Sequence, residues 1–393
     1  MNDLVFGYTE YSVCKKLVSW VSFIFRKRAY WKWHPLRNGT AMRNIIYCFT
    51  IGFLLLLPVY SMARVTGNCV SCHTMHNSQD NLWVAESSTP NPALLVADCI
   101  GCHTGQNDGR NTIPYVFSTT PPQYRDTGTE ADSNTLAGGS FYWVSSIGDR
   151  RGHNVKGLAA PDQFLSTPPG GDGTFNQQLR CAGTMGCHGN KEISEQISAV
   201  KGSHHYTDHR IWQPGTSLAG SYRMLDGIQG LGDPDYEYHP TDLSHNKYYG
   251  IDRTSESETA EGTISSHCAR CHEDYHNGPL TLSPNRILGA GVWLRHPTDF
   301  DMSNAVSSTE YQLYNNSSSY GNNIYSVIAP VATVDTTTTL NTRIFSQAND
   351  ALVMCLSCHR AHGSPFAGAL RWNYKAWPAG GYNGCAVCHT AKN

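Results

Sequence analysis

Apolar and polar positions follow a regular period over only short distances in this chain. Helical spacing is confined to short runs, and we predict helices at residues 192–198 and 309–314 and at each cysteine motif described below. Two runs alternate with a period of two and are predicted as strands, at residues 141–147 and 323–334. Between these runs, proline and glycine pairs such as Pro168-Pro169-Gly170-Gly171 are typical of turns. The pattern therefore predicts a mainly irregular fold with few short helices and strands.

The longest apolar run lies near the N-terminus, at residues 45–59. Met42-Arg43-Asn44 is a short basic start and Ser61-Met62-Ala63 has a small-x-small pattern, so residues 42–63 are predicted as a secretory signal peptide. The run contains Pro58 and is shorter than the roughly 20 apolar residues of a transmembrane helix, so no membrane anchor is expected. We interpret residues 1–41 as an upstream extension from a mis-assigned start codon, and residues 64–393 as one mature domain.

Six cysteine motifs, each followed directly by a histidine, recur along the mature part. In chain order we number them motif 1 to motif 6. Two thiols on one short loop can form thioethers to the same porphyrin, and the following histidine then binds the iron as its proximal ligand, so this is the attachment pattern of c-type haem. The regular copies, Cys-x-x-Cys-His, are motif 1 (Cys69, Cys72, His73), motif 2 (Cys99, Cys102, His103), motif 4 (Cys268, Cys271, His272), motif 5 (Cys355, Cys358, His359) and motif 6 (Cys385, Cys388, His389), and motif 3 is a longer copy with Cys181, Cys187 and His188.

Other uses of paired cysteines are less consistent with this pattern. A redox dithiol, half a zinc site or a disulfide would not place a histidine after every second cysteine. For motif 3 the alternative is a Cys181–Cys187 disulfide, but Gly183 and Gly186 would let the longer loop bulge and keep both sulfurs at a haem edge. We therefore expect six covalently attached c-type haems, whose apolar faces form the core around which the chain wraps.

The charge of the mature part is negative. The whole chain has 29 basic and 31 acidic residues, of which 8 basic and 2 acidic residues lie in residues 1–63, so the mature part has a net charge of −8. This balance argues against nucleic acid or an anionic membrane as a partner, and leaves a mineral or a positively charged redox protein. Haem attachment of this kind takes place outside the cytoplasmic membrane, which agrees with the predicted signal peptide. A secreted protein at the cell outer surface or beyond it is expected.

Eleven further histidines in the mature part are candidates for the second axial position of the irons. Three of them follow a proximal histidine by three or four residues and cannot easily reach the far face of their own haem, so they favour close pairs of haems. If every iron has two histidines, no position is open for a substrate, and electron transfer is the expected chemistry. Seven candidates compete for six irons, namely His76, His276, His362, His153, His296 and the adjacent pair His204 and His205, whereas His209, His239, His245 and His267 are expected to be surface or hydrogen-bonded histidines.

Several stretches resemble the OmcS-like family, the six-haem outer-surface cytochromes of metal-reducing bacteria, whose subunits polymerise into conducting filaments. The likeness spans most of residues 64–393 in islands such as Cys72-His73-Thr74-Met75-His76-Asn77-Ser78, Leu294-Arg295-His296-Pro297 and motif 5 with Arg360-Ala361-His362. The chain departs from the family in the long motif 3, in the His204-His205 pair and in motif 2, which no histidine follows closely. The resemblance implies stacked haems with two histidines each, and implies that His76 ligates the haem of motif 5 in the neighbouring subunit.

We thus expect a secreted hexahaem electron carrier that polymerises into a conductive extracellular filament. It would exchange electrons with partner cytochromes and deliver them to external acceptors such as metal oxides. The alternative is a periplasmic or outer-surface shuttle that does not polymerise. A third hypothesis is a reductase of nitrogen or sulfur oxyanions, which needs one haem open on its distal side, often with lysine in place of the motif histidine. Because all six motifs end in histidine, we do not expect an enzyme.

Overall fold

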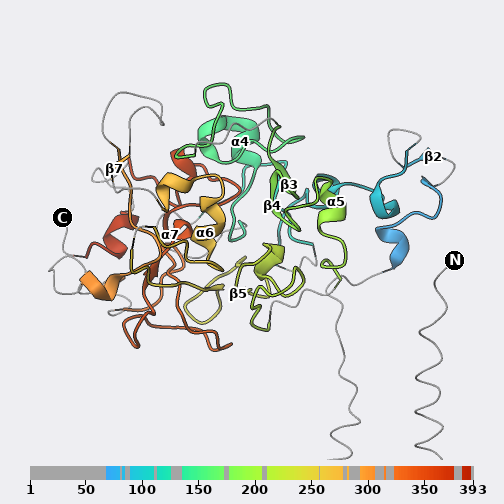
Figure 1. The fold of residues 1–393 in the computed structure, drawn as a ribbon. Helices are drawn as coiled ribbons and strands as arrows, with labels where there is room; N and C mark the ends of the chain where they lie inside the picture. Colours follow the sequence, from blue (N-terminus) through green and yellow to red (C-terminus); the bar gives the residue numbers. More distant parts are fainter. Residues whose placement is uncertain are drawn as a thin grey trace, which may run out of the picture. The chain divides into compact units, whose positions relative to one another are not determined.

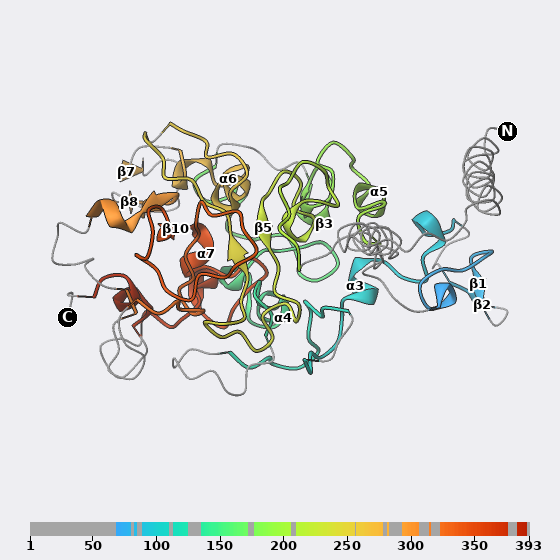
Figure 2. The same ribbon diagram turned by 90° about the horizontal axis from the view of Figure 1, so that it is seen from below.

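A computed structural model describes most of the predicted mature chain, and all described residues belong to one compact unit, Met62–Asn393. The predicted signal peptide and the upstream extension lie outside the described residues. Figures 1 and 2 show short helices and strands joined by long loops. The described residues are 68–79, 82–84, 89–109, 113–124, 135–171, 177–205, 210–255, 257–277, 281–282, 293–305, 314–315, 323–375 and 383–390.

Regular elements are short throughout, which confirms the predicted irregular fold. The α-helices are α3 (Cys99–Cys102), α4 (Tyr142–Ile147), α5 (Gln196–Ala199), α6 (Ile264–Ala269) and α7 (Cys355–Cys358). The 3-10 turns are η2 (Cys69–Ser71), η3 (Pro92–Leu94), η4 (Asp149–Arg151), η5 (Tyr222–Met224), η6 (Glu273–Tyr275), η8 (Met302–Ala305), η9 (Ala367–Ala369) and η10 (Gly384–Val387).

The strands form two-stranded pairs. Among the described residues four pairs are antiparallel: β1 (Ser78–Gln79) with β2 (Leu82–Trp83), β5 (Gly230–Leu231) with β6 (Lys247–Tyr248), β7 (Thr281–Leu282) with β8 (Trp293–Leu294), and β9 (Phe300–Asp301) with β10 (Leu352–Val353). The fifth pair, β3 (Arg180–Ala182) with β4 (Gly186–His188), is parallel. Such small sheets have no face wide enough for a layered core.

Both predicted strands were wrong. Residues 141–147 contain α4, in which Val144 is the one buried residue, and the helix ends where Gly148 takes a φ of 129°. Residues 323–334 make only isolated bridges, such as Ile324 with Arg343 and Ala332 with Leu352, because the apolar residues between them are buried in the core rather than on one face of a sheet. The predicted helix at 192–198 corresponds to α5, which starts later, whereas 309–314 lies outside the described residues apart from Tyr314.

The capping of α5 explains where that helix begins. The Glu195 carboxylate accepts hydrogen bonds from the backbone N–H groups of Ile197 and Ser198, at 2.9 and 2.7 Å. These N–H groups have no partner inside a helix, so an acceptor at this position fixes the first turn. The helix therefore starts after Glu195 and not at residue 192.

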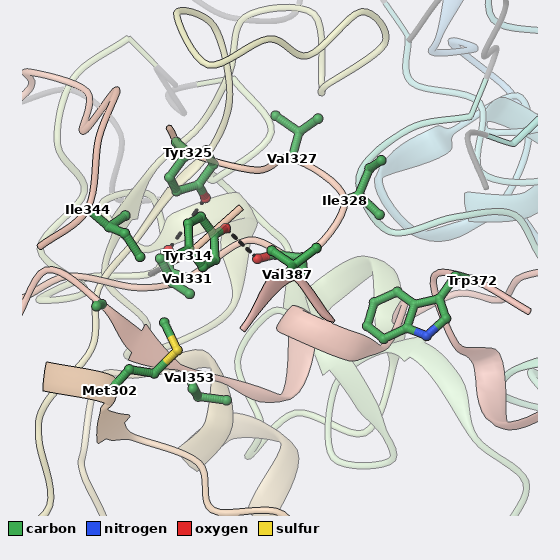
Figure 3. Close-up of a cluster of buried hydrophobic side chains, with 12 residues drawn as sticks. Met302, Tyr314, Tyr325, Val327, Ile328, Val331, Ile344, Val353, Trp372 and Val387 are labelled. Carbon is green, nitrogen blue, oxygen red and sulfur yellow. Dashed lines mark hydrogen bonds between the residues drawn. The ribbon is translucent and has the colours of Figure 1, made fainter. Parts of the chain in front are cut away.

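Two hydrophobic clusters form the core of the described chain. In the first, shown in Figure 3, the buried Tyr314 hydroxyl donates to the Ala329 carbonyl at 2.7 Å. Cys358 and Cys388 pack against this cluster. The second contains Tyr222, Tyr248, Leu352 and Met354 among its members, and Leu356 packs against it. Since Leu356 and Cys358 both belong to motif 5, the two clusters meet that motif through different residues. The first cluster comprises Met302, Tyr314, Tyr325, Val327, Ile328, Ala329, Val331, Ile344, Ala351, Val353, Trp372 and Val387.

Candidate haem-binding sites

Each regular motif lies on one turn of helix, as predicted. The turns are η2, α3, the end of α6, α7 and η10. In each of them the backbone N–H of the histidine donates to the carbonyl of the first cysteine. Residues three or four apart lie on the same side of a helical turn, so this bond brings both thiols and the histidine together. The N–O distances are 2.8 Å for His73, 2.9 Å for His103, 3.0 Å for His272, 3.1 Å for His359 and 2.8 Å for His389.

Motif 3 has a different backbone, and the expected helix is absent from it. Its two cysteines lie on β3 and β4, which run parallel with Arg180 opposite Gly186. Gly183 has a φ of 85°, and a Cβ on Gly186 would lie 2.6 Å from the backbone of Ala182, so the loop needs glycine at both positions. Cys181 and Cys187 are both free thiols, so the alternative disulfide is not formed. A tight loop here takes the place of the helical turn.

Most proximal histidines are oriented by a hydrogen bond to the backbone. The Nδ1–H group donates to a carbonyl, which leaves Nε2 as the nitrogen for a metal. The acceptors are Ala93 for His73 at 2.9 Å, Pro114 for His103 at 2.8 Å, Arg223 for His188 at 3.0 Å, Pro169 for His272 at 2.7 Å and Gly368 for His359 at 2.7 Å. The predicted second ligands His153 and His296 bond in the same way to Ala361 at 2.7 Å and to Pro297 at 2.9 Å.

Four proximal histidines face a predicted second ligand across a gap of similar size. Two imidazoles on opposite faces of one iron have ring centroids roughly 6 Å apart, because each nitrogen lies about 2 Å from the metal. The spacing of such a pair therefore leaves room for one iron between the two rings. The ring-centroid distances are 6.2 Å for His103–His204, 6.3 Å for His188–His362, 6.0 Å for His272–His153 and 6.1 Å for His389–His296.

The surroundings of these rings favour the neutral form that binds iron. Desolvation by the surrounding chain lowers the pKa of His188, with a smaller contribution from the nearby His103. Desolvation and then His153 lower the pKa of His272 to about 4, and desolvation and then His188 lower the pKa of His362 to about 3. At neutral pH these three rings are therefore uncharged and ready to coordinate a metal.

The other predicted ligands have different environments. His76 is exposed beside Met75, whose side chain is 81 % exposed, and His205 is exposed next to His204. His276 is buried, and its ring nitrogens bond to Asn277 and, at 2.8 Å, to the Asp299 carboxylate. This placement argues against His276 as an iron ligand, because both nitrogens already have partners.

His267 is a feature that the sequence did not predict. We expected a surface or hydrogen-bonded histidine, but the ring is buried and neither nitrogen has a hydrogen-bond partner. Burial, and then the charges of Lys191 and Arg270, lower its pKa to about 3. Its position directly before Cys268 was the one available indication that it lies against motif 4. A buried ring without polar partners suits contact with the apolar face of a haem.

The sulfur atoms link the motifs in chain order. Hydrogen bonds join Cys99 of motif 2 to Cys181 of motif 3, and Cys268 of motif 4 to Cys355 of motif 5. The remaining links are electrostatic. Burial, and then the charge of Cys72, raise the pKa of Cys102. Burial, and then Cys271, raise the pKa of Cys187 to about 11, and burial, and then Cys385, raise the pKa of Cys358 to about 12. Figure 2 shows the same succession, from α3 through β3 to α6 and α7.

These motifs have the pattern that binds c-type haem covalently, and the chain is similar to multihaem c-type cytochromes. A family model described as the doubled CXXCH motif matches residues 348–393, which contain motifs 5 and 6. The chain is also similar to C-type cytochrome OmcS of Geobacter sulfurreducens, with 27% identity over 354 residues, covering 78% of each chain. The resemblance to OmcS-like cytochromes is thereby confirmed.

Two solved structures are also similar to this chain. One is the Outer Membrane Cytochrome S filament from Geobacter sulfurreducens, at 21% identity and a TM-score of 0.39, and the other is the OmcS nanowire from the same organism, at 22% identity and a TM-score of 0.41. Each match covers 79% of this chain and 84% of that chain. Among the residues described for the present chain, no helix combines the length and the apolar character needed to cross a bilayer.

Proposed function

We propose that this protein is an electron carrier in which six haems each have two histidine ligands. The observation that supports this most strongly is the set of four histidine pairs about 6 Å apart. In this assignment His204 serves motif 2, His362 serves motif 3, His153 serves motif 4 and His296 serves motif 6. The histidine missing after motif 2 is thus replaced by His204, which is 101 residues further along the chain than His103.

The second ligands of motifs 1 and 5 are not indicated by a histidine pair among the described residues. Among the described residues, neither His73 nor His359 has a partner ring at the spacing seen for the other four. We assign His205 to motif 1, because Cys72 and Cys102 place motif 1 beside motif 2 and His205 follows the ligand of motif 2 directly. With His276 held by Asp299, His76 is the remaining predicted candidate for motif 5.

An exposed His76 at one end of the haem series favours a ligand supplied between subunits. His76 follows motif 1, the first motif of the series, and would reach motif 5 of the next copy. The related OmcS is named as a filament and as a nanowire in its solved structures. A homopolymer of this kind would conduct electrons along an unbroken series of haems to external acceptors such as metal oxides, with partner cytochromes supplying the electrons.

The chain's own residues define what each site does in this proposal. The carbonyls that accept from Nδ1 fix the proton on that nitrogen, and desolvation lowers the pKa of His188, His272 and His362, which keeps these rings neutral. Haem, once attached, supplies the reversible one-electron chemistry. Because two histidines would hold each iron, the sites would exclude water and substrate, and electron transfer would require little rearrangement of the protein.

Haem counting and carbon monoxide binding on the exported protein test this proposal. Intact-mass analysis should give six haems, and the reduced filament should bind almost no carbon monoxide. Dissociated monomers should expose one iron in six, because only motif 5 takes its ligand from a neighbour. Five haems would refute the assignment of motif 3. Monomers without an open iron would favour a shuttle that does not polymerise, and an open iron in the filament would favour an enzyme.

A further inference from the structure

Arg371 is a buried cation without an acidic partner. Its side chain is 1 % exposed, and its Nε and Nη1 groups donate to the carbonyls of Leu356 at 2.6 Å and Val327 at 3.3 Å. The second terminal nitrogen, Nη2, is buried and has no hydrogen-bond partner. Within the described part of the chain, no carboxylate pairs with this guanidinium. A guanidinium remains protonated in proteins, so Arg371 is a permanent buried positive charge.

A second arginine increases the positive charge at this place. Arg360 directly follows His359, and its Nη1 donates to the carbonyls of Leu136 and Ala137 at 3.1 and 2.9 Å. Burial, and then the charge of Arg371, lower the pKa of Arg360 to about 10. Two like charges thus lie near each other, with carbonyls and the Tyr124 ring as the contacts of Arg360, and the buried Glu237 carboxylate offsets only part of this positive charge. Such an arrangement is costly unless the completed site contributes negative charge.

Both charges lie beside motif 5. The backbone N–H of Arg371 donates to the Cys358 carbonyl at 2.8 Å, and its side chain bonds to Leu356 between the two cysteines. The two hydrophobic clusters meet this motif, so water screens the charge little.

We propose that Arg371 is a fixed positive charge that raises the reduction potential of the haem on motif 5. Reduction adds one electron to this haem, and a buried cation nearby stabilises the more negative reduced form. This inference rests on the proposed function and extends it, since motif 5 is the haem to which the neighbouring subunit supplies its ligand. Arg371 would thus set the reduction potential of the haem at the interface between subunits.

Potentiometric titration of four variants tests the charge separately from packing. Arg371→Gln retains a donor for the Leu356 carbonyl, and Arg371→Met fills the space with an apolar chain, a replacement that buried ions often tolerate. Arg371→Lys retains the charge. Lys375→Gln removes an exposed charge from the same segment and is the matched control.

In both neutral Arg371 variants, one of the six one-electron components should move to lower potential. Its reduced-to-oxidised ratio at a fixed potential should fall about tenfold, the order of magnitude expected for loss of one nearby unit charge in a medium with an effective dielectric constant of about 20. This ratio corresponds to a shift of about 59 mV. Arg371→Lys should retain most of the wild-type value, and Lys375→Gln should match the wild type.

Three results would overturn the inference: unchanged potentials in both neutral variants, an upward shift, or an equal fall in Lys375→Gln. Haem mass and the low-spin spectrum confirm that each variant is assembled. Failure of the proposed function is a separate outcome, because it would appear in the wild type as missing haems or open irons. The difference in potential between variants remains measurable in that case.

Discussion

Substitution of His362 by alanine should open the iron of motif 3 while all six haems remain attached. The His362 ring lies 6.3 Å from the His188 ring and 4.8 Å from the Phe141 ring, measured between centroids. Its backbone N–H donates to the Gly138 carbonyl at 2.7 Å, and this bond survives the substitution. The change therefore removes the second ligand without removing the backbone contact that holds the segment in place.

The expected magnitudes follow from these contacts. Carbon monoxide should bind about one sixth of the reduced haem in an assembly whose other irons are closed. Loss of a ring packed against Phe141 should also cost about 3 kcal/mol of unfolding free energy, in the range measured for large-to-alanine substitutions in protein interiors. The effect on stability should be local, because the thioethers of motif 3 do not depend on His362.

Difference spectroscopy of the reduced protein with carbon monoxide measures the open iron. His239→Ala is the matched control, because His239 is an exposed histidine that contacts Tyr238 and faces no proximal histidine. Added imidazole should restore the low-spin spectrum of His362→Ala by filling the empty position. If His362→Ala binds no more carbon monoxide than His239→Ala, the pairing of His188 with His362 is wrong.

Three further predictions concern assembly, pH and packing. His76→Ala should retain six haems, expose one iron and abolish filaments under the electron microscope, whereas filaments that lack only one low-spin haem would place His76 on its own subunit. Burial, and then a hydrogen bond with Asp235, raise the pKa of Asp233 from 3.8 to about 7, so its contribution to stability should be lost as pH rises from about 4 to about 7. Urea unfolding should show that the free energy of unfolding falls less in Asp233→Asn than in the wild type over this pH range. Equal dependence on pH in the two proteins would exclude the effect. Gly384→Ala would push a methyl group into the Trp372 ring and should lower the unfolding free energy by about 1–3 kcal/mol in thermal melts; an unchanged melting temperature would contradict this packing.

The class of protein could be predicted from the sequence because each haem motif is local. Two cysteines and a histidine within five residues contain the chemistry of attachment, and a single helical turn is enough to align them. Motif 3 shows the limit of this reasoning. Its glycines indicated a bulged loop, but the parallel pairing of β3 with β4 depends on contacts that the spacing of the cysteines does not determine.

The sequence predicts less well which histidine lies next to which motif, because the two residues come from distant segments of the chain. His204 lies beside His103 only because the intervening chain returns to motif 2, and no periodicity in the sequence reports that return. His276 and His362 were both predicted as second iron ligands, since both follow a motif closely. The buried Asp299 carboxylate bonds to His276, and this contact could not be read from the sequence.

The failed strand predictions have a related cause. Alternation at residues 141–147 resembled a half-buried strand, but α4 buries Val144 alone and is terminated by Gly148. The segment around Tyr325 is apolar because it fills the interior beneath motifs 5 and 6, and not because it pairs in a sheet. The core of this chain is expected to include porphyrin faces. The placement of apolar residues in the sequence then reflects contact with the cofactors more than the period of a helix or strand.

A cryo-electron microscopy reconstruction of the haem-loaded protein tests the central claim most directly. We expect six haems in the order of motifs 1 to 6, each with two histidines on its iron. His204, His362, His153 and His296 should lie on the irons of motifs 2, 3, 4 and 6, and His76 of one copy should lie on motif 5 of the next. An empty motif 3, a permuted order of haems or a different histidine on any of these four irons would contradict the assignment.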